Sequence, residues 1–149
     1  MPSKENKISE KELQSLRKQY TKSSLSAKNV NKDPFRQFEK WFSEVLTSGF
    51  YEPNNMTLAT ASKNGIPSAR VVLLKGIDEN GFMFYSNYKS RKGKDIEQNP
   101  FGCLLFYWDK LERQVRIEGK IEKVSKEESE LYFNTRPYKS RLGAWASNQ

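Results

Sequence analysis

The sequence predicts a mainly β protein with flanking helices, built as a closed or split antiparallel barrel. Three early apolar segments are joined by turns too short for the crossover helix that parallel strands require. A later segment alternates apolar and charged residues, which is typical of a strand with one buried and one solvent-exposed face. Closing a barrel removes exposed strand edges, so it suits a chain of short antiparallel strands.

Composition favours one globular domain. The chain has 149 residues, of which 36% are hydrophobic and 13% aromatic, enough for a single core. No apolar run is long enough to span a bilayer, and the first residues lack the apolar region of a secretory signal. Cys103 is the only cysteine, which indicates a reducing compartment. We therefore expect a cytoplasmic protein with no membrane partner.

The absence of histidine excludes several chemistries. Ser-His-Asp triads, Cys-His dyads and histidine-ligated zinc all need a residue that this sequence lacks, and no metal site is expected. The net charge of +8 predicts attraction to anions. Nucleic acid, a membrane surface and phosphorylated small molecules all remain open on charge alone.

Two regions precede the strands. Residues 1–32 are rich in lysine and predict a mobile basic segment, with a short helix over 10–20, whereas 33–149 predicts the folded domain. Asp33 and Pro34 are typical of a helix start and Gly49 of a helix stop. The apolar residues between them recur at helical spacing and predict one face packed on the core: Phe35, Phe38, Trp41, Phe42, Val45 and Leu46.

The middle of the chain predicts strands and a short helix. Segments 56–62 and 66–76 form a hairpin at Asn64-Gly65, and 81–87 adds a third strand of a meander. A helix over 90–99 and strands over 101–109 and 112–124 follow. Ser125 begins a helix to about Thr135 through a capping box, and 140–149 begins another. Within these strands, Cys103 is interpreted as a small buried hydrophobe.

A first group of cations suggests a phosphate site. Arg70 and Lys75 bracket an apolar run and, being an odd number of positions apart, face opposite sides of a regular strand. Arg91 and Lys92 open the short helix, where free backbone N–H groups add positive potential. The alternative is that each cation is a solvated surface charge.

A second group lies near the end of the chain. Tyr132 and Arg136 are four residues apart on a predicted helix, hence on one face, and Ser140 follows the Pro137 turn. Two hydroxyls and a guanidinium would suit a second phosphate. The alternative is that Tyr132 packs its ring while Arg136 caps the helix. Gln114, with Arg116 on the same strand face, is interpreted as solvated.

Seven sequence blocks together resemble one family. They are LRKQYTK (16–22), DPFRQFEKW (33–41), RVVLLKG (70–76), FYSNYKSRKG (84–93), NPFGCLLFYW (99–108), LERQVRIEGKIEKVS (111–125) and YFNTRPYKSRLGAWAS (132–147). In this order they resemble the pyridoxine/pyridoxamine 5′-phosphate oxidase family. LERQVR and the Arg-Pro-x-x-Ser segment are the most distinctive.

The resemblance implies an FMN-binding split barrel that forms a homodimer, with the flavins at the subunit interface. It implies oxidation of pyridoxamine or pyridoxine 5′-phosphate to pyridoxal 5′-phosphate, with molecular oxygen as acceptor and hydrogen peroxide as product. Because the flavin performs the redox step, no catalytic acid or base is assigned to the protein.

The resemblance also implies binding residues. Those for FMN are Arg70, Val71, Val72, Leu73, Leu74, Lys75, Tyr85, Ser86, Arg91, Lys92, Gln114 (reaching the flavin of the partner subunit) and Gln149. Those for the substrate are Arg17, Lys18, Gln19, Tyr20, Lys75, Tyr132, Arg136 and Ser140. Arg17 to Tyr20 resembles a mobile segment that closes over the substrate.

One departure leaves alternatives open. Family members continue past the position of Gln149 into a segment that supplies further FMN and substrate contacts, and this sequence does not contain it. The first alternative to the oxidase is therefore a non-catalytic barrel that binds flavin or pyridoxal phosphate. A nucleic-acid-binding barrel is disfavoured, because the lysines concentrate at the start and charge is balanced along 112–130. We expect no nucleic-acid partner.

Overall fold

The computed structural model describes residues 8–22 and 24–146. The chain divides into two compact units, Met1–Val30 and Asn31–Gln149, which we describe separately. The first unit contains α1 (Glu10–Ser15). The second contains α2 (Pro34–Thr47), β1 (Asn55–Ala61), β2 (Pro67–Leu73), β3 (Gly76–Asp78), β4 (Gly81–Met83), α3 (Arg91–Gln98), β5 (Phe101–Trp108), the 3₁₀ turn η1 (Asp109–Leu111), β6 (Arg113–Lys120), α4 (Lys126–Thr135) and α5 (Tyr138–Ala146).

The helix of the first unit is shorter than predicted. A capping box between Ser9 and Glu12 begins α1, but the helix ends at Ser15 instead of reaching Tyr20. Leu13 and Leu16 are 56% and 79% exposed, so within residues 8–22 the helix has little apolar packing to support further turns. Short helices without such packing are marginal in water, which explains the early end.

Helix α2 begins and packs as the sequence predicts. The Asp33 carboxylate accepts a hydrogen bond from the Phe35 backbone N–H at 2.9 Å, and Pro34 occupies the first helical position. Phe38 and Val45 are buried, with Trp41 and Phe42 half-buried against the same core. Leu46 was predicted on this face but is 58% exposed.

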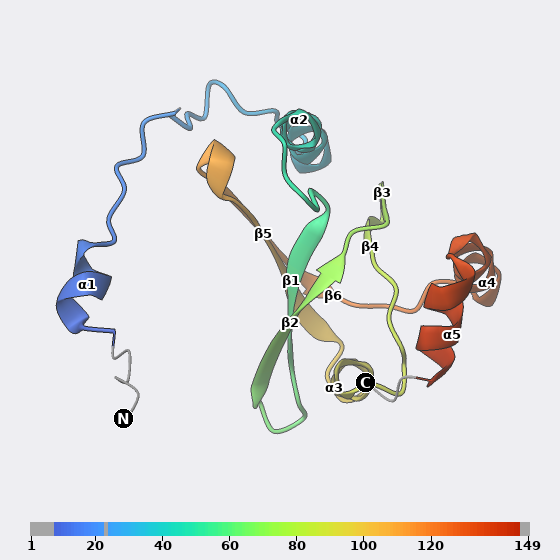
Figure 1. Cartoon of the computed structure of the whole chain (residues 1–149). Helices are drawn as coiled ribbons and strands as arrows, with labels where there is room; N and C mark the ends of the chain where they lie inside the picture. The colour runs from blue at the N-terminus through green and yellow to red at the C-terminus, as the bar shows by residue number, and fades with distance from the viewer. Residues whose placement is uncertain (1–7, 23, 147–149) are drawn as a thin grey trace, which may run out of the picture. The chain divides into compact units, whose positions relative to one another are not determined.

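The strands form a four-stranded antiparallel sheet in the order β2-β1-β5-β6 and a separate β3-β4 hairpin (Figure 1). The β1-β2 hairpin turns through Gly65, at a φ of 77°. The predicted three-strand meander is wrong, because β4 pairs with β3 and not with β2. The predicted strand over 81–87 also shortens to Gly81–Met83.

The break between β2 and β3 has a local cause. The Leu74 N–H donates to the Asn54 carbonyl at 2.8 Å, and the Asn54 side chain returns a bond to the Leu74 carbonyl at 2.9 Å. The next N–H, that of Lys75, donates to the Met83 carbonyl at 2.8 Å. The backbone therefore changes partners between Leu74 and Lys75. One predicted strand becomes two, and Lys75 lies beyond the end of β2.

The sheet has one core face and one more open face. The buried core comprises Phe38, Val45, Met56, Leu58, Val72, Leu74, Leu104, Phe106 and Trp108. On the opposite face Val71, Phe101 and Tyr107 are 66%, 64% and 61% exposed. Cys103 is half-buried on that open face, paired across β1 with Ala59 and across β6 with Glu118. Its interpretation as a fully buried hydrophobe is therefore wrong in degree, because the alternation of β5 directs Cys103 away from the buried Leu104 and onto the more open face.

Two helices close the described part of the chain. The Ser125–Glu128 capping box begins α4, which ends at Thr135 as predicted. Pro137 separates it from α5, which begins two residues earlier than expected. Strand β6 ends at Lys120, short of the predicted 124. Among the described residues, no helix has the length and apolar character needed to cross a membrane.

Candidate functional site

The loop before α3 packs tightly on the start of that helix. The Ser90 hydroxyl is the N-cap, accepting from the Gly93 N–H and donating to the Asn87 carbonyl. A Cβ on Gly93 would overlap the Tyr88 carbonyl oxygen, which only a hydrogen atom avoids. Glycine at this position therefore lets the Tyr85–Lys89 loop lie against the first turn of α3.

Three cations meet around this helix start: Arg70 from β2, and Arg91 and Lys92 from the first turn. Burial lowers the pKa of Lys92, and the charge of Arg70 lowers it further. The pKa of Arg70 is lowered by burial first, is raised by Asp95 and is lowered again by Arg91. The structure thus brings together three of the cations predicted to bind FMN.

A buried hydrogen-bond network holds Arg70. Its Nη1 donates to the Thr60 hydroxyl at 2.8 Å and the Leu58 carbonyl at 3.0 Å, and its Nη2 donates to the Ser68 hydroxyl. Both hydroxyls donate to Oδ2 of Asp95, at 3.0 and 2.9 Å. Asp95 lies on α3 and is 8% exposed. We call Thr60, Ser68, Arg70, Arg91, Lys92 and Asp95 the α3 cluster.

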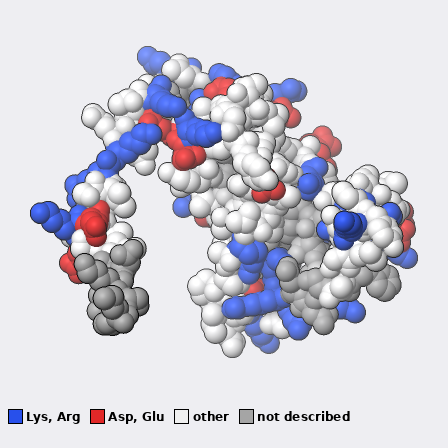
Figure 2. Space-filling model, viewed as in Figure 1, with Lys and Arg blue, Asp and Glu red and all other residues white. Residues whose placement is uncertain are grey.

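The charge of the α3 cluster favours an anion. The cluster holds three cations and one carboxylate, which interacts with Arg70 and Arg91, and the free N–H groups of the α3 start add to the positive potential. Hydrogen bonds from Ser68 and Thr60 hold the pKa of the Asp95 carboxyl below its usual range, and Arg91 and Arg70 lower it further. Lys and Arg side chains gather in the region of α3 in Figure 2. A phosphate would supply the missing negative charge.

The second predicted group is more open. Tyr132 lies on α4 and Ser140 on α5, and Ser140 is exposed. Arg136 is the C-cap of α4, with an extended backbone at φ −74° and ψ 144°. The expectation that Tyr132 and Arg136 share a helical face is therefore wrong in detail, because Pro137 forces its preceding residue out of the helix.

An aromatic stack joins the two predicted groups. The rings of Tyr85 and Tyr132 lie parallel, with centroids 3.7 Å apart and planes 5° apart. The Lys75 ammonium lies 6.0 Å from the Tyr132 ring centroid. Desolvation raises the pKa of Tyr85, with Glu128 and Tyr132 adding to the rise. We call Lys75, Tyr85, Tyr132, Arg136 and Ser140 the α4 cluster, in which these contacts join the first three residues, whereas Arg136 and Ser140 are included from the sequence prediction.

The predicted run from Arg70 to Lys75 divides between the two faces of the sheet. Val72 and Leu74 are buried in the core, so only their backbone can reach a ligand. Val71 is exposed and Leu73 half-buried on the other face. Gln114 is exposed on β6, opposite Tyr107, in agreement with a wet strand face. Ser86 is half-buried in the loop before α3.

The remaining predicted residues lie elsewhere. Arg17, Lys18, Gln19 and Tyr20 belong to the first unit, where all four are exposed beyond the end of α1. Their role in substrate binding stays a prediction. Gln149 lies outside the described residues.

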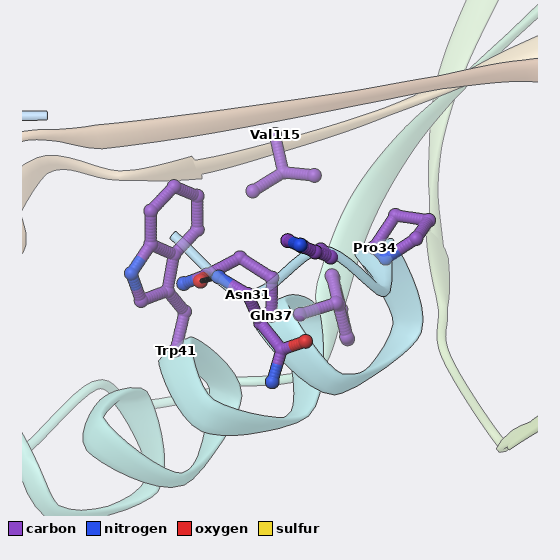
Figure 3. A pocket seen from close by; sticks show the side chains of 7 residues that line it. Asn31, Pro34, Gln37, Trp41 and Val115 are labelled. Carbon is purple, nitrogen blue, oxygen red and sulfur yellow. Dashed lines mark hydrogen bonds between the residues drawn. The ribbon is translucent and has the colours of Figure 1, made fainter. Parts of the chain in front are cut away.

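Two features were not predicted as functional. Asp95, Thr60 and Ser68 come from three separate elements, and only the register of β1 with β2, which pairs Thr60 with Ser68, could have placed two of them together. The second is an apolar pocket between α2 and β6, where Trp41 and Pro34 lie on opposite sides and Val115 faces them from the strand (Figure 3). It contains none of the predicted ligand residues.

Comparison with known proteins decides the family. The model of a protein family described as pyridoxamine 5′-phosphate oxidase matches residues 42–149. The chain belongs to this family. The pyridoxine/pyridoxamine 5′-phosphate oxidases of Burkholderia ambifaria and Paraburkholderia phytofirmans are 58% and 56% identical to it over 137 residues. These matches cover 92% of this chain and 64% of each relative, so the chain spans about two thirds of their length.

Solved structures agree on the fold. PhzG from Burkholderia lata, solved with tetrahydrophenazine-1-carboxylic acid, aligns with a TM-score of 0.79 at 25% identity. The alignment covers 85% of this chain and 63% of the PhzG chain. An FMN-binding protein from Nostoc punctiforme, related to pyridoxamine 5′-phosphate oxidase, aligns with a TM-score of 0.59 at 22% identity, covering 74% and 62%. These matches confirm the predicted split-barrel fold class.

Proposed function

We propose that this chain binds FMN through the α3 cluster and belongs to an enzyme that oxidises pyridoxamine or pyridoxine 5′-phosphate to pyridoxal 5′-phosphate. The observation that carries the proposal is the unbalanced charge of the α3 cluster, in which Arg70 and Arg91 interact with the carboxylate of Asp95 and Lys92 adds a third positive charge close to Arg70. Membership of the pyridoxamine 5′-phosphate oxidase family supports FMN as the ligand whose phosphate binds there.

The residues present fit the phosphate of FMN. An arginine can form two parallel hydrogen bonds to a phosphate, and a lysine adds a point charge. Arg70 is fixed by the buried network, while Arg91 is exposed at the surface of the same helix start. The backbone groups of the run from Val71 to Leu74 would border the flavin ring, since Val72 and Leu74 are buried and Val71 and Leu73 lie on the face of β2 opposite to Arg70.

The substrate phosphate is assigned to the α4 cluster. Lys75, Tyr132, Arg136 and Ser140 supply two charges and two hydroxyls, which match a phosphate monoester. The Tyr85–Tyr132 stack places this group beside the loop that packs on α3. The protein's task is then to hold the pyridine ring beside the flavin in a fixed orientation.

The proposed reaction balances with molecular oxygen. Pyridoxine 5′-phosphate and O₂ give pyridoxal 5′-phosphate and hydrogen peroxide, and pyridoxamine 5′-phosphate also consumes water and releases ammonia. FMN, when bound, supplies the redox chemistry by accepting a hydride equivalent from the carbon that becomes the aldehyde. The side chains of this chain bind and orient, and none is assigned a proton transfer.

A homodimer with FMN at its interface is part of the proposal. Val71, Phe101 and Tyr107 form an exposed apolar face on the sheet, of the kind that marks an interaction surface. Gln114 lies on the same face, opposite Tyr107. In a dimer this face would be covered, and Gln114 would then reach the flavin of the partner subunit.

The first experiment measures binding of FMN and of riboflavin, which lacks the phosphate, by quenching of flavin fluorescence. We expect FMN to bind at least about tenfold more tightly, because a charge-assisted contact is worth roughly 1.5–3 kcal/mol. Equal affinities would contradict a phosphate site at α3. Analytical ultracentrifugation with and without FMN tests the dimer.

The second experiment measures oxygen consumption when pyridoxamine 5′-phosphate is added to the FMN-loaded chain. Uptake with matching formation of pyridoxal 5′-phosphate supports the oxidase. FMN binding without any oxygen uptake would favour the non-catalytic flavin-binding barrel instead.

A further inference from the structure

We propose that Asp95 is a positioning residue for the phosphate site, acting through the hydroxyls of Thr60 and Ser68 to hold the Arg70 guanidinium toward the ligand. This inference rests on the proposed binding of FMN at the α3 cluster. It concerns a residue that contacts no ligand itself.

The connection between Asp95 and Arg70 runs through the hydroxyls. The closest approach of the two charged groups is 3.9 Å, from Nη2 of Arg70 to Oδ2 of Asp95, which is too long for a hydrogen bond. Thr60 and Ser68 lie between them and bond to both. The two hydroxyl oxygens are 3.2 Å apart, so together they present adjacent hydrogen-bond acceptors to the guanidinium.

The carboxylate sets the direction of these bonds. A hydroxyl has one hydrogen to donate, and an ionised carboxylate only accepts. The hydrogens of Thr60 and Ser68 therefore point to Asp95, and their lone pairs are left for Arg70. Without the carboxylate either hydrogen can turn toward the guanidinium, where it meets another donor. Thr60 is 3% exposed and Asp95 8%, so bulk water does not replace the lost acceptor.

The network leaves a defined part of Arg70 for a ligand. Nη1 uses both of its hydrogens, on Thr60 and on Leu58, and Nη2 uses one on Ser68. The bonds within the described part of the chain leave Nε and the second hydrogen of Nη2. These two N–H groups form one edge of the guanidinium, the edge that can bind two oxygens of a phosphate in parallel.

A positioning role and a purely electrostatic role for Asp95 predict opposite changes in phosphate affinity when the Asp95 carboxylate is removed. If Asp95 acted only through its charge, removing that charge would strengthen binding of a phosphate dianion nearby. If Asp95 orients Arg70, removing it weakens phosphate binding in spite of the more favourable net charge. The sign of the change therefore separates the two accounts.

The test compares the dissociation constants of FMN and riboflavin in the full chain and its Asp95→Ala and Asp95→Asn variants. We expect Asp95→Ala to weaken FMN about tenfold or more, the value of one well-placed charged hydrogen bond, and to leave riboflavin within about twofold. Asp95→Asn should be intermediate, because its amide oxygen accepts while its NH₂ group donates. Glu97→Gln, which removes an exposed charge from the same helix, is the matched control and should not weaken FMN.

Ser68→Ala removes one arm of the network and keeps the test decisive if Asp95→Ala does not fold. It should weaken FMN severalfold and leave riboflavin unchanged. A purely structural role for Asp95 would weaken both flavins together and lower the unfolding temperature in parallel. That result, or unchanged FMN affinity in Asp95→Asn and Ser68→Ala, would overturn the inference. A wild-type chain that binds FMN no better than riboflavin would instead overturn the phosphate site itself.

Discussion

The α3 cluster and the α4 cluster both combine cations with hydroxyls, but the chain organises them differently. In the α3 cluster, Arg70 is bound on two sides by buried groups, with its side chain 19% exposed. In the α4 cluster, Ser140 is exposed and Arg136 follows the end of a helix. A preorganised site suits a cofactor that stays bound, since less ordering is needed on binding. A site that exchanges substrate at each turnover does not need the same rigidity.

Arg70→Ala should have the largest effect and should act on FMN alone. We expect the FMN dissociation constant to rise about 100-fold, because a bidentate charged contact is lost, while riboflavin binding changes little. Asp95 also loses its partner, so the free energy of unfolding should fall by roughly 1–3 kcal/mol. Fluorescence titration and denaturant unfolding measure the two effects. Arg36→Ala, which removes an exposed arginine from α2, is the control and should change neither.

Arg136→Ala should act on the substrate instead. We expect the KM for pyridoxamine 5′-phosphate to rise about tenfold or more, with the FMN dissociation constant unchanged. Steady-state oxygen uptake and FMN titration measure the two. Lys139→Ala removes an exposed cation from the neighbouring helix and should have no such effect. Similar losses of FMN and substrate binding in Arg70→Ala and Arg136→Ala would show that the division into two phosphate sites is wrong.

The Tyr85–Tyr132 stack should make the two clusters partly dependent on each other. Stacked aromatic pairs contribute about 0.5–1.5 kcal/mol beyond their buried area, so a double-mutant cycle of Tyr85→Leu and Tyr132→Leu should show a coupling of that size in the free energy of unfolding. Tyr85→Phe keeps the ring and should retain the coupling with Tyr132. Strict additivity of the two leucine variants would mean that the clusters are independent.

Low pH should reduce the contribution of Asp95 to the stability of the α3 cluster by protonating its carboxylate. We expect this effect to be smaller than those of the substitutions above. Bonds from Ser68 and Thr60, with Arg91 and Arg70, hold the pKa of this carboxyl below its unfolded value of about 3.9. Its contribution to stability is therefore complete above that pH and is lost as pH falls through the lower folded value. The difference in unfolding free energy between wild type and Asp95→Asn should shrink over this range. A difference independent of pH would contradict the assignment.

The cations of the α3 cluster could be predicted from the sequence, but the hydrogen-bond network that holds Arg70 could not. Arg91 and Lys92 are local to a predicted helix start, and Arg70 sits in a recognisable strand, so periodicity and capping rules place all three. Asp95 looks like any polar residue of a short helix. Its burial depends on packing α3 against Thr60 and Ser68, which no local pattern encodes.

The limits of sequence reasoning follow the same division in the fold. Local signals determined α2, the β1-β2 hairpin and the start of α4, because caps and turns act within a few residues. Tertiary structure decided where β2 ends, since the change of partner at Leu74 and Lys75 depends on Asn54 and Met83. It also decided that Tyr85 meets Tyr132. Such contacts join residues far apart in the chain, and their free energy appears only when the folded backbone brings them together.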